Sequence, residues 1–209
     1  MTITIGGKFG SGGKAIAEKL AEMTGCKLCG DEFFREALLQ SGEHISESII
    51  EAFDESLGDS SINEMRHQST LEKKGFSGLS GNLMSKVEPV DERLGNIYRE
   101  TIEKFADEGD CIILGHFGDY FLRDRKDCLR VFVIDAPESR KERIAESRGI
   151  TPEKAEKIIA EADKRRAQYY KFYTDDKWGE FGTYDLLCDC SAFGIEGCAK
   201  LIKAASEIK

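Results

Sequence analysis

The sequence has little proline, no surplus of positive charge and no long hydrophobic run. Its 209 residues include only 3 prolines, and 33% are charged, which argues against a disordered or low-complexity chain. The formal net charge at pH 7 is −9, whereas binding to a nucleic-acid backbone depends on clustered positive charge. We therefore expect no nucleic-acid partner, and any anion-binding site should be a local feature.

The sequence also lacks a segment long enough to cross a bilayer, and it has no basic leader followed by an apolar stretch. The first residues, MTITI, lead directly into a glycine-rich turn. We therefore expect a cytoplasmic protein without membrane contacts. The length suits one α/β domain with an insertion, so we expect a single domain over residues 1–209.

The 7 cysteines are an odd number, which favours reduced thiols over a disulfide framework. The pairs Cys26/Cys29 and Cys188/Cys190 have a spacing that zinc ligands use. The second pair lies in a strand-like apolar run, where cysteines also serve as small core residues. We favour core packing and keep zinc binding as the alternative.

Hydrophobic patterns predict strands that alternate with helices. Short apolar runs indicate strands at residues 3–5, 27–29, 111–114, 129–134 and 184–188. Helical patterns cover residues 13–25, 31–61, 92–108, 137–147, 152–170 and 194–208. Between residues 56 and 88 the composition shifts to Ser, Gly, Asn and Lys, so we expect an exposed excursion there. The alternation predicts a three-layer α/β/α fold with a mainly parallel sheet.

A glycine-rich segment, GGKFGSGGK at residues 6–14, stands between the first predicted strand and the first predicted helix. Backbone N–H groups and a helix N-terminus at such a place can surround a polyphosphate. The alternative is a flexible turn that only joins strand to helix. We favour ATP phosphate binding and assign it to Gly7, Lys8, Gly10, Ser11, Gly12, Gly13 and Lys14.

The loop departs from the standard P-loop pattern G-x-x-x-x-G-K-[ST]. Laid on Gly7 to Gly12, the pattern puts Gly13 where lysine belongs and Lys14 where the magnesium-binding hydroxyl belongs. Either Lys14 or Lys8 then supplies the positive charge, and Ser11 is the candidate hydroxyl for Mg²⁺. The expected cofactors are ATP and Mg²⁺.

Several motifs together resemble the cytidylate kinase-like family of P-loop nucleoside monophosphate kinases. They include FGSGGK at residues 9–14, CIILG at 111–115, DK at 163–164, WG at 178–179 and GIEG at 194–197. The resemblance covers nearly the whole chain apart from roughly residues 55–90. It implies a P-loop NTPase fold in which the missing lysine is a family trait. It also implies a helical monophosphate-binding insertion at about residues 31–90 and a lid at about residues 145–175.

Two departures from the family lie on the acceptor side. Many relatives read Asp-Arg where this chain has Asp31-Glu32, and Gly-Arg where it has Gly115-His116. Neither glutamate nor a mostly neutral histidine reproduces the bidentate grip of arginine on phosphate. The candidate acceptor contacts are Asp31, His116 and Asp119, of which Asp119 could instead order water around Mg²⁺ or fix the loop after its strand.

Arginines are concentrated in the predicted lid, although the chain is acidic overall. Phosphoryl transfer needs positive groups around the transferred phosphate, because negative charge spreads over its oxygens. We assign catalytic roles to Lys14, Arg148 and Arg166. For Arg140 and Arg143, a solvated or structural role weighs as much as ligand binding, since many glutamates lie nearby.

The preferred hypothesis is reversible transfer of the ATP γ-phosphate to a nucleoside monophosphate, with CMP or dCMP first by resemblance. The expected partners are small-molecule nucleotides. One alternative is a nucleotide-binding regulatory protein that transfers little, motivated by Ala15, Glu32 and His116. Another is a kinase for a different small phosphorylated or hydroxylated acceptor.

Overall fold

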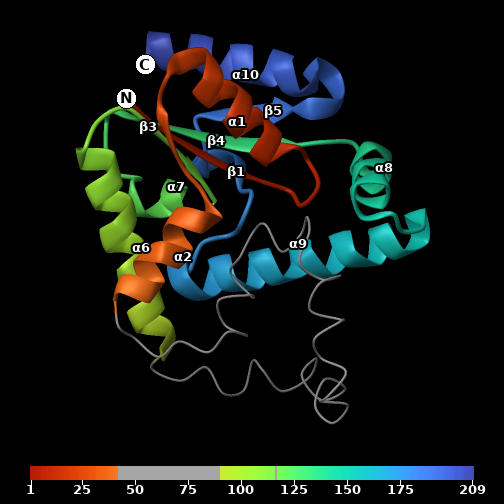
Figure 1. Ribbon diagram of the computed structural model, residues 1–209, viewed down its shortest axis with the longest axis horizontal. Coiled ribbons are helices and arrows are strands. Elements are labelled where there is room, and N and C mark those ends of the chain that lie inside the picture. The colour runs from red at the N-terminus through yellow and green to blue at the C-terminus, as the bar shows by residue number, and fades with distance from the viewer. Residues whose placement is uncertain (42–89, 116) are drawn as a thin grey trace.

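The computed structural model describes residues 1–41, 90–115 and 117–209, and it contains one five-stranded parallel sheet (Figure 1). Its strands lie in the order β2-β3-β1-β4-β5, and every neighbouring pair is parallel. Their bounds are β1 Thr2–Gly7, β2 Lys27–Cys29, β3 Cys111–Leu114, β4 Cys128–Ile134 and β5 Leu186–Asp189. The predicted parallel sheet is confirmed.

Helices cover both faces of the sheet. One face carries α1 (Gly13–Thr24) and α10 (Cys190–Ile208). The other face carries α2 (Asp31–Gln40), α6 (Val90–Asp107), α7 (Gly118–Phe121) and the long α9 (Pro152–Thr174). Helix α8 (Pro137–Arg148) lies beyond the end of β4 and packs against α9. A short 3₁₀ helix, Phe181–Thr183, precedes β5. The predicted three-layer α/β/α architecture is confirmed.

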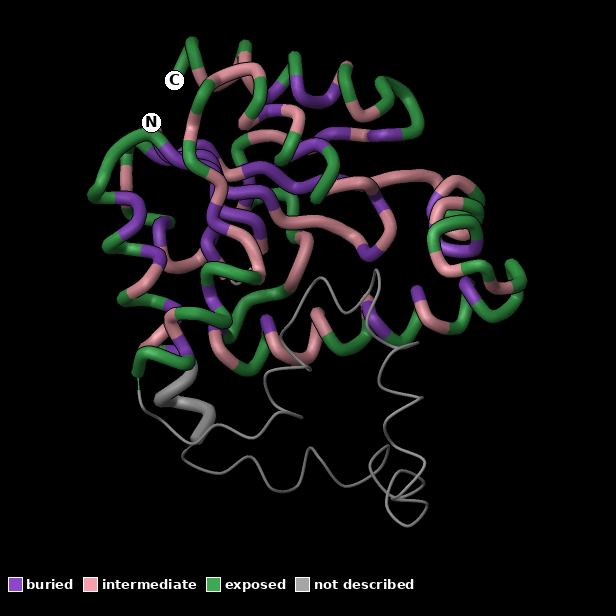
Figure 2. Tube along the Cα trace, viewed as in Figure 1, coloured by how far each residue is buried: buried purple, intermediate pink, exposed green. Residues whose placement is uncertain are grey.

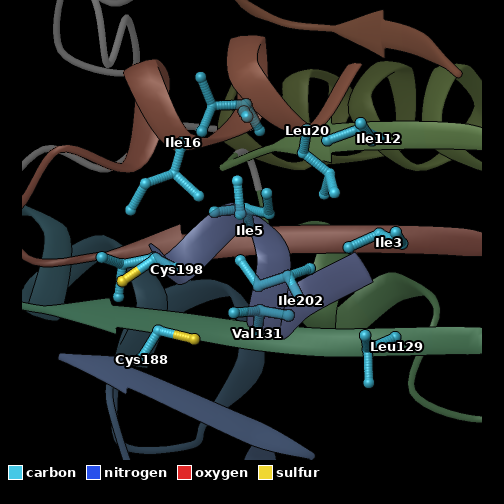
Figure 3. Packing of buried hydrophobic residues seen from close by; sticks show 14 of the residues in the cluster. Ile3, Ile5, Ile16, Leu20, Ile112, Leu129, Val131, Cys188, Cys198 and Ile202 are labelled. Carbon is cyan, nitrogen blue, oxygen red and sulfur yellow. The ribbon is translucent and has the colours of Figure 1, made fainter. Parts of the chain in front are cut away.

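Each face of the sheet has its own hydrophobic core, and the buried segments gather around the strands (Figure 2). Strand β3 contributes to both cores, because successive side chains of a strand point to opposite faces. Ile112 and Leu114 face α1 and α10, whereas Cys111 and Ile113 face α2 and α6. Figure 3 shows the first core, in which Leu20 of α1 packs with residues of β1, β4 and α10. A strand buried on both faces explains the unbroken apolar run CIIL.

Several strands and helices begin or end at other residues than the sequence predicts. Strand β1 continues to Gly7, because Gly6 and Gly7 still pair with β4. The last strand begins at Leu186, not near residue 184, and α9 continues to Thr174. The last helix begins at Cys190 and contains a kink at Gly194, where φ is 65°. Because Gly6 and Gly7 belong to β1, the glycine-rich loop is shorter than the sequence pattern suggests.

The zinc alternative for the cysteines is wrong. Cys29 is in β2 and Cys188 in β5, which form opposite edges of the sheet. Within the described ranges, no group of three or more His, Cys, Asp or Glu side chains could hold a metal ion. Cys29, Cys188 and Cys190 are buried, and burial raises the pKa of the Cys188 thiol to about 11. Core packing of these thiols is confirmed.

The predicted helical insertion is described only at its start. Helix α2 confirms the helical pattern for Asp31–Gln40. The excursion predicted between residues 56 and 88 lies outside the described residues. Among the helices that the structure describes, none is both long and apolar enough to span a membrane.

Candidate nucleotide-binding site

The glycine-rich loop lies at the carboxyl end of the central strand β1. The chain crosses to β2 and β3 on one side of β1, and then to β4 and β5 on the other. Ligands of such sheets bind at this switch in strand order. Helix α1 begins directly after the loop at Gly13, and no side chain of the described residues caps it. Its first N–H groups therefore remain available to an anion.

Three of the loop glycines are required by the surrounding packing. A Cβ on Gly7 would lie 2.7 Å from the carbonyl oxygen of Val133, and one on Gly12 would lie 2.6 Å from Cδ1 of Ile195. Gly10 and Gly12 also have φ values of 77° and 86°, which disfavour any side chain. At Gly13, by contrast, no atom of the described chain lies within 4 Å of a built Cβ. The position where the standard pattern has lysine is thus open.

The lysines and the serine of the loop occupy different surroundings. Lys14 is exposed on the first turn of α1. The ammonium of Lys8 lies 4.4 Å from the centre of the Trp178 ring, so it interacts with an aromatic face. Ser11 is 1% exposed, and its hydroxyl has no hydrogen-bond partner within the described part of the chain. The sequence left open whether Lys14 or Lys8 supplies the positive charge for phosphate. In the structure Lys14 is exposed at the start of α1, whereas Lys8 contacts the Trp178 ring.

Arginines from α8 and α9 converge on the loop. Arg166 Nη1 donates a hydrogen bond to the Gly7 carbonyl at 3.0 Å, and its guanidinium lies 5.2 Å from the centre of the Phe9 ring. The Arg148 guanidinium lies 5.4 Å from the same ring. The structure thus brings both predicted catalytic arginines to the loop, although their catalytic roles stay predictions.

Arg140 and Arg143 also contact the loop, through its backbone. Arg140 donates to the Phe9 carbonyl at 2.7 Å and to Asp163 at 2.6 Å. Arg143 donates to the Gly10 carbonyl, and it pairs with the fully buried carboxylate of Asp135 at 2.6 Å. Arg140 and Arg143 therefore both have a structural role in this structure, which is one of the two roles that the sequence left open.

Sequence reasoning missed the acidic partners of these arginines. Asp163 accepts hydrogen bonds from both Phe9 N–H and Arg140, and Asp135 follows the last residue of β4. The spacing of the charged residues along the two helices could have indicated these contacts. Arg140 and Arg143 are three residues apart, as are Asp163 and Arg166, and residues at this spacing share one face of a helix.

Two of the three predicted acceptor residues, Asp31 and Asp119, lie farther along the same edge of the sheet. Asp31 is the first residue of α2, after the end of β2. Asp119, on α7, is 6% exposed and accepts a 2.6 Å hydrogen bond from the Tyr170 hydroxyl of α9. His116 lies outside the described residues. Burial raises the pKa of the Asp119 carboxyl, and its hydrogen bonds with Tyr170 and Tyr184 oppose that rise.

The raised pKa of Asp119 predicts a specific dependence of stability on pH. The folded state binds this proton more tightly, so the contribution of Asp119 to stability is complete below an ordinary carboxyl pKa of about 3.9. It is lost as the pH rises through the raised pKa. An Asp119→Asn variant lacks this loss and still offers an oxygen to Tyr170.

We therefore expect the stability of Asp119→Asn relative to wild type to increase between pH 4 and pH 7, by about 1.4 kcal/mol for each unit of pKa shift. Urea unfolding at several pH values measures the free energies. The exposed control Asp124→Asn should keep the wild-type profile, since the Asp124 side chain is 93% exposed. Parallel profiles for wild type and Asp119→Asn would contradict the prediction.

The fold matches several solved structures. An uncharacterized protein from Eubacterium ventriosum aligns over 100% of this chain and 99% of its own, with a TM-score of 0.70 and 21% identity. A shikimate kinase from Bacteroides thetaiotaomicron aligns over 99% and 98%, with a TM-score of 0.51 and 14% identity. A gluconokinase from Sinorhizobium meliloti aligns over 99% and 94%, with a TM-score of 0.51 and 15% identity. At these identities the likeness shows the fold alone, which this chain shares with the shikimate kinase and the gluconokinase.

Sequence comparison gives more specific relatives. The cytidylate kinase of Archaeoglobus fulgidus is 27% identical over 215 residues, which cover 100% of this chain and 96% of that protein. The cytidylate kinase of Pyrococcus horikoshii is 26% identical over 98% of this chain and 88% of its own length. Because residues 2–192, from the first strand into α10, match the model of the cytidylate kinase-like family, this chain belongs to that family.

Proposed function

We propose that this protein transfers the γ-phosphoryl group of Mg-ATP to a nucleoside monophosphate, with CMP and dCMP as the first acceptors to test. Membership of a kinase family and two cytidylate kinases among its relatives support this choice. One observation carries it: a glycine loop before the uncapped start of α1 is contacted by arginines from α8 and α9.

The loop residues fit the phosphates of ATP. Gly7, Gly10 and Gly12 allow close backbone approach, and the open position at Gly13 adjoins the first turn of α1. For Mg²⁺ the chain offers the hydroxyl of Ser11 and no cluster of acidic ligands in its described residues. This suits an ion that keeps several waters and is bound mainly through substrate phosphates. Bound Mg-ATP would supply the transferable phosphoryl group.

In this proposal the cations have separate tasks. Lys14 and the loop N–H groups hold ATP phosphates, whereas Arg148 and Arg166 offset the charge that develops on the transferred group. Arg166 already lies at the loop, where one of its N–H groups donates to the Gly7 carbonyl. The lid at about residues 145–175, from which Asp163 and Arg166 already contact the loop, would exclude water from the bound phosphates.

The acceptor side is assigned to Asp31, His116 and Asp119. Asp31 begins α2 at the carboxyl end of β2, and we propose that it contacts the acceptor nucleotide. Asp119 holds α9 through Tyr170, so we assign it the positioning of the lid helix relative to the acceptor. Arginine is absent at both departures from the family, so we expect these two positions to give the acceptor phosphate no bidentate contact.

The test is ADP production from Mg-ATP with CMP, dCMP, UMP, AMP or GMP as the acceptor. We expect acceptor-dependent turnover, and we expect Lys14→Ala to weaken Mg-ATP binding roughly tenfold, since a charge-assisted hydrogen bond contributes about 1.5–3 kcal/mol. Lys19→Ala is the matched control, because Lys19 lies on the same helix and pairs with Glu22.

Two results would redirect the proposal. Binding of Mg-ATP without turnover for any of the five acceptors would favour a nucleotide-binding regulatory protein. Turnover only with another phosphorylated or hydroxylated small molecule would retain the kinase and change its acceptor.

A further inference from the structure

Side chains of α8 and α9 hold the backbone of the P-loop from outside. Arg166 binds the Gly7 carbonyl, Asp163 accepts from the Phe9 N–H, Arg140 binds the Phe9 carbonyl, and Arg143 binds the Gly10 carbonyl. Each peptide plane joins the carbonyl of one residue to the N–H of the next. These contacts therefore engage four consecutive planes, from the Gly7–Lys8 peptide to the Gly10–Ser11 peptide.

Phe9 is the centre of this arrangement. Its N–H donates to Asp163 at 2.9 Å, its carbonyl accepts from Arg140 at 2.7 Å, and Arg140 donates to Asp163 at 2.6 Å. The three bonds close a ring around one residue. The Phe9 side chain, 5% exposed, packs in a small core with Ile144 of α8 and Ile159 of α9. Backbone and ring of Phe9 thus both join the loop to the helix pair.

The ring of bonds sets the direction of the neighbouring N–H groups. In a trans peptide the carbonyl and the N–H point in opposite directions. Because Arg140 holds the Phe9 carbonyl, the N–H of Gly10 points away from Arg140. In the next peptide both groups are engaged, since Arg143 holds the Gly10 carbonyl and the Ser11 N–H donates to the Lys8 carbonyl at 3.0 Å. The direction of the Gly10 N–H is thus fixed before a ligand arrives, as a phosphate cradle requires.

Burial makes this arrangement costly to break. Arg140 is 9% exposed, and the side chain of Asp163 is 18% exposed. Removing one member of such a pair leaves a charge with little water around it. The sequence separation is also large, because Phe9 lies 131 residues from Arg140 and 154 from Asp163. The contact therefore depends on how the helix pair sits against the sheet.

We propose that Arg140 and Asp163 are positioning residues that hold the P-loop at Phe9 in the conformation that binds ATP phosphates. The ligand in this inference, ATP, rests on the proposed function. The geometry rests only on the ring of three hydrogen bonds around Phe9. It separates these two residues from Arg148 and Arg166, which are proposed to contact phosphate directly. Loss of the ring should weaken ATP binding and leave the acceptor site unaffected.

The test compares Asp163→Ala with the double variant Arg140→Met/Asp163→Ala, which leaves no unpaired charge and so guards against misfolding. Glu161→Gln, an exposed acid on the same helix, is the matched control. Titration calorimetry gives the Kd for Mg-ATP, and NMR hydrogen exchange without nucleotide follows the Phe9 amide. We expect both variants to raise Kd about tenfold and to speed exchange at Phe9 more than tenfold. The KM for the acceptor should change less than twofold, and the control should match wild type in every measurement.

A folded double variant with a wild-type Kd would overturn the proposal, as would an equal rise in KM for the acceptor. If the wild-type protein does not bind Mg-ATP, the proposed function fails, and the amide measurement still decides the geometry. In that case faster exchange at Phe9 with an unchanged amide at Ile112 of the sheet supports the positioning role, and unchanged exchange at Phe9 refutes it.

Discussion

Replacing Arg166 with alanine is expected to lower acceptor-dependent phosphoryl transfer by about 10²–10³-fold, the usual cost of losing one preorganised donor to a developing charge. Arg166 lies at the P-loop, with one N–H on the Gly7 carbonyl and its guanidinium 5.2 Å from the Phe9 ring centre. Because the proposed role of Arg166 is to offset charge that develops only in the transition state, most of the loss should appear in kcat. Steady-state ADP production measures it.

Arg165→Ala is the matched control for this experiment. Arg165 has the same charge, is adjacent in the sequence and is exposed. It should change turnover less than about threefold, since a solvated arginine contributes little to a site that it does not contact. Equal losses in both variants would mean that the general positive charge of the helix matters, and the specific role of Arg166 would be wrong.

Gly7→Ala is expected to reduce both stability and ATP binding. Gly7 pairs with Val133, whose carbonyl oxygen would lie 2.7 Å from the new methyl carbon, and Ser11 Oγ would lie 3.1 Å from it. A backbone oxygen in a central strand cannot rotate away, so the two strands must separate. We expect a loss of about 1–3 kcal/mol in the free energy of unfolding, and roughly 2–4 °C in Tm for each kcal/mol.

The shift at Gly7 should also disturb the nucleotide site, because the Gly7 carbonyl is the acceptor for Arg166. For the stability measurement Gly13→Ala is the control, since a methyl group there meets no atom of the described chain within 4 Å. Its Tm should equal or exceed that of wild type, because alanine is favoured over glycine in a helix. A wild-type Tm for Gly7→Ala would show that β1 and β4 accommodate the methyl group, contrary to this prediction.

Much of the fold could be predicted from local patterns. The run CIIL became the buried strand β3, the alternation of strands and helices became a parallel three-layer sheet, and Thr151-Pro152 began α9 as expected. Such patterns depend on near neighbours in the chain, so the sequence displays them directly. The end of β1 was less predictable, because glycines usually indicate a turn and only pairing with β4 keeps Gly6 and Gly7 in the strand.

The candidate site also has features that the sequence predicted and features that it did not. Residue patterns were enough to predict the glycine loop between strand and helix, the absence of the standard lysine at Gly13, and the concentration of arginines in the lid region. They did not predict that Arg140 and Arg143 hold loop carbonyls, that Lys8 lies over Trp178, or that Asp163 closes a ring on Phe9. These partners lie far apart along the chain and meet only when it folds. A charged residue looks alike in sequence whether it faces water or a backbone more than a hundred residues away, and only packing of the helix pair on the sheet selects its partner.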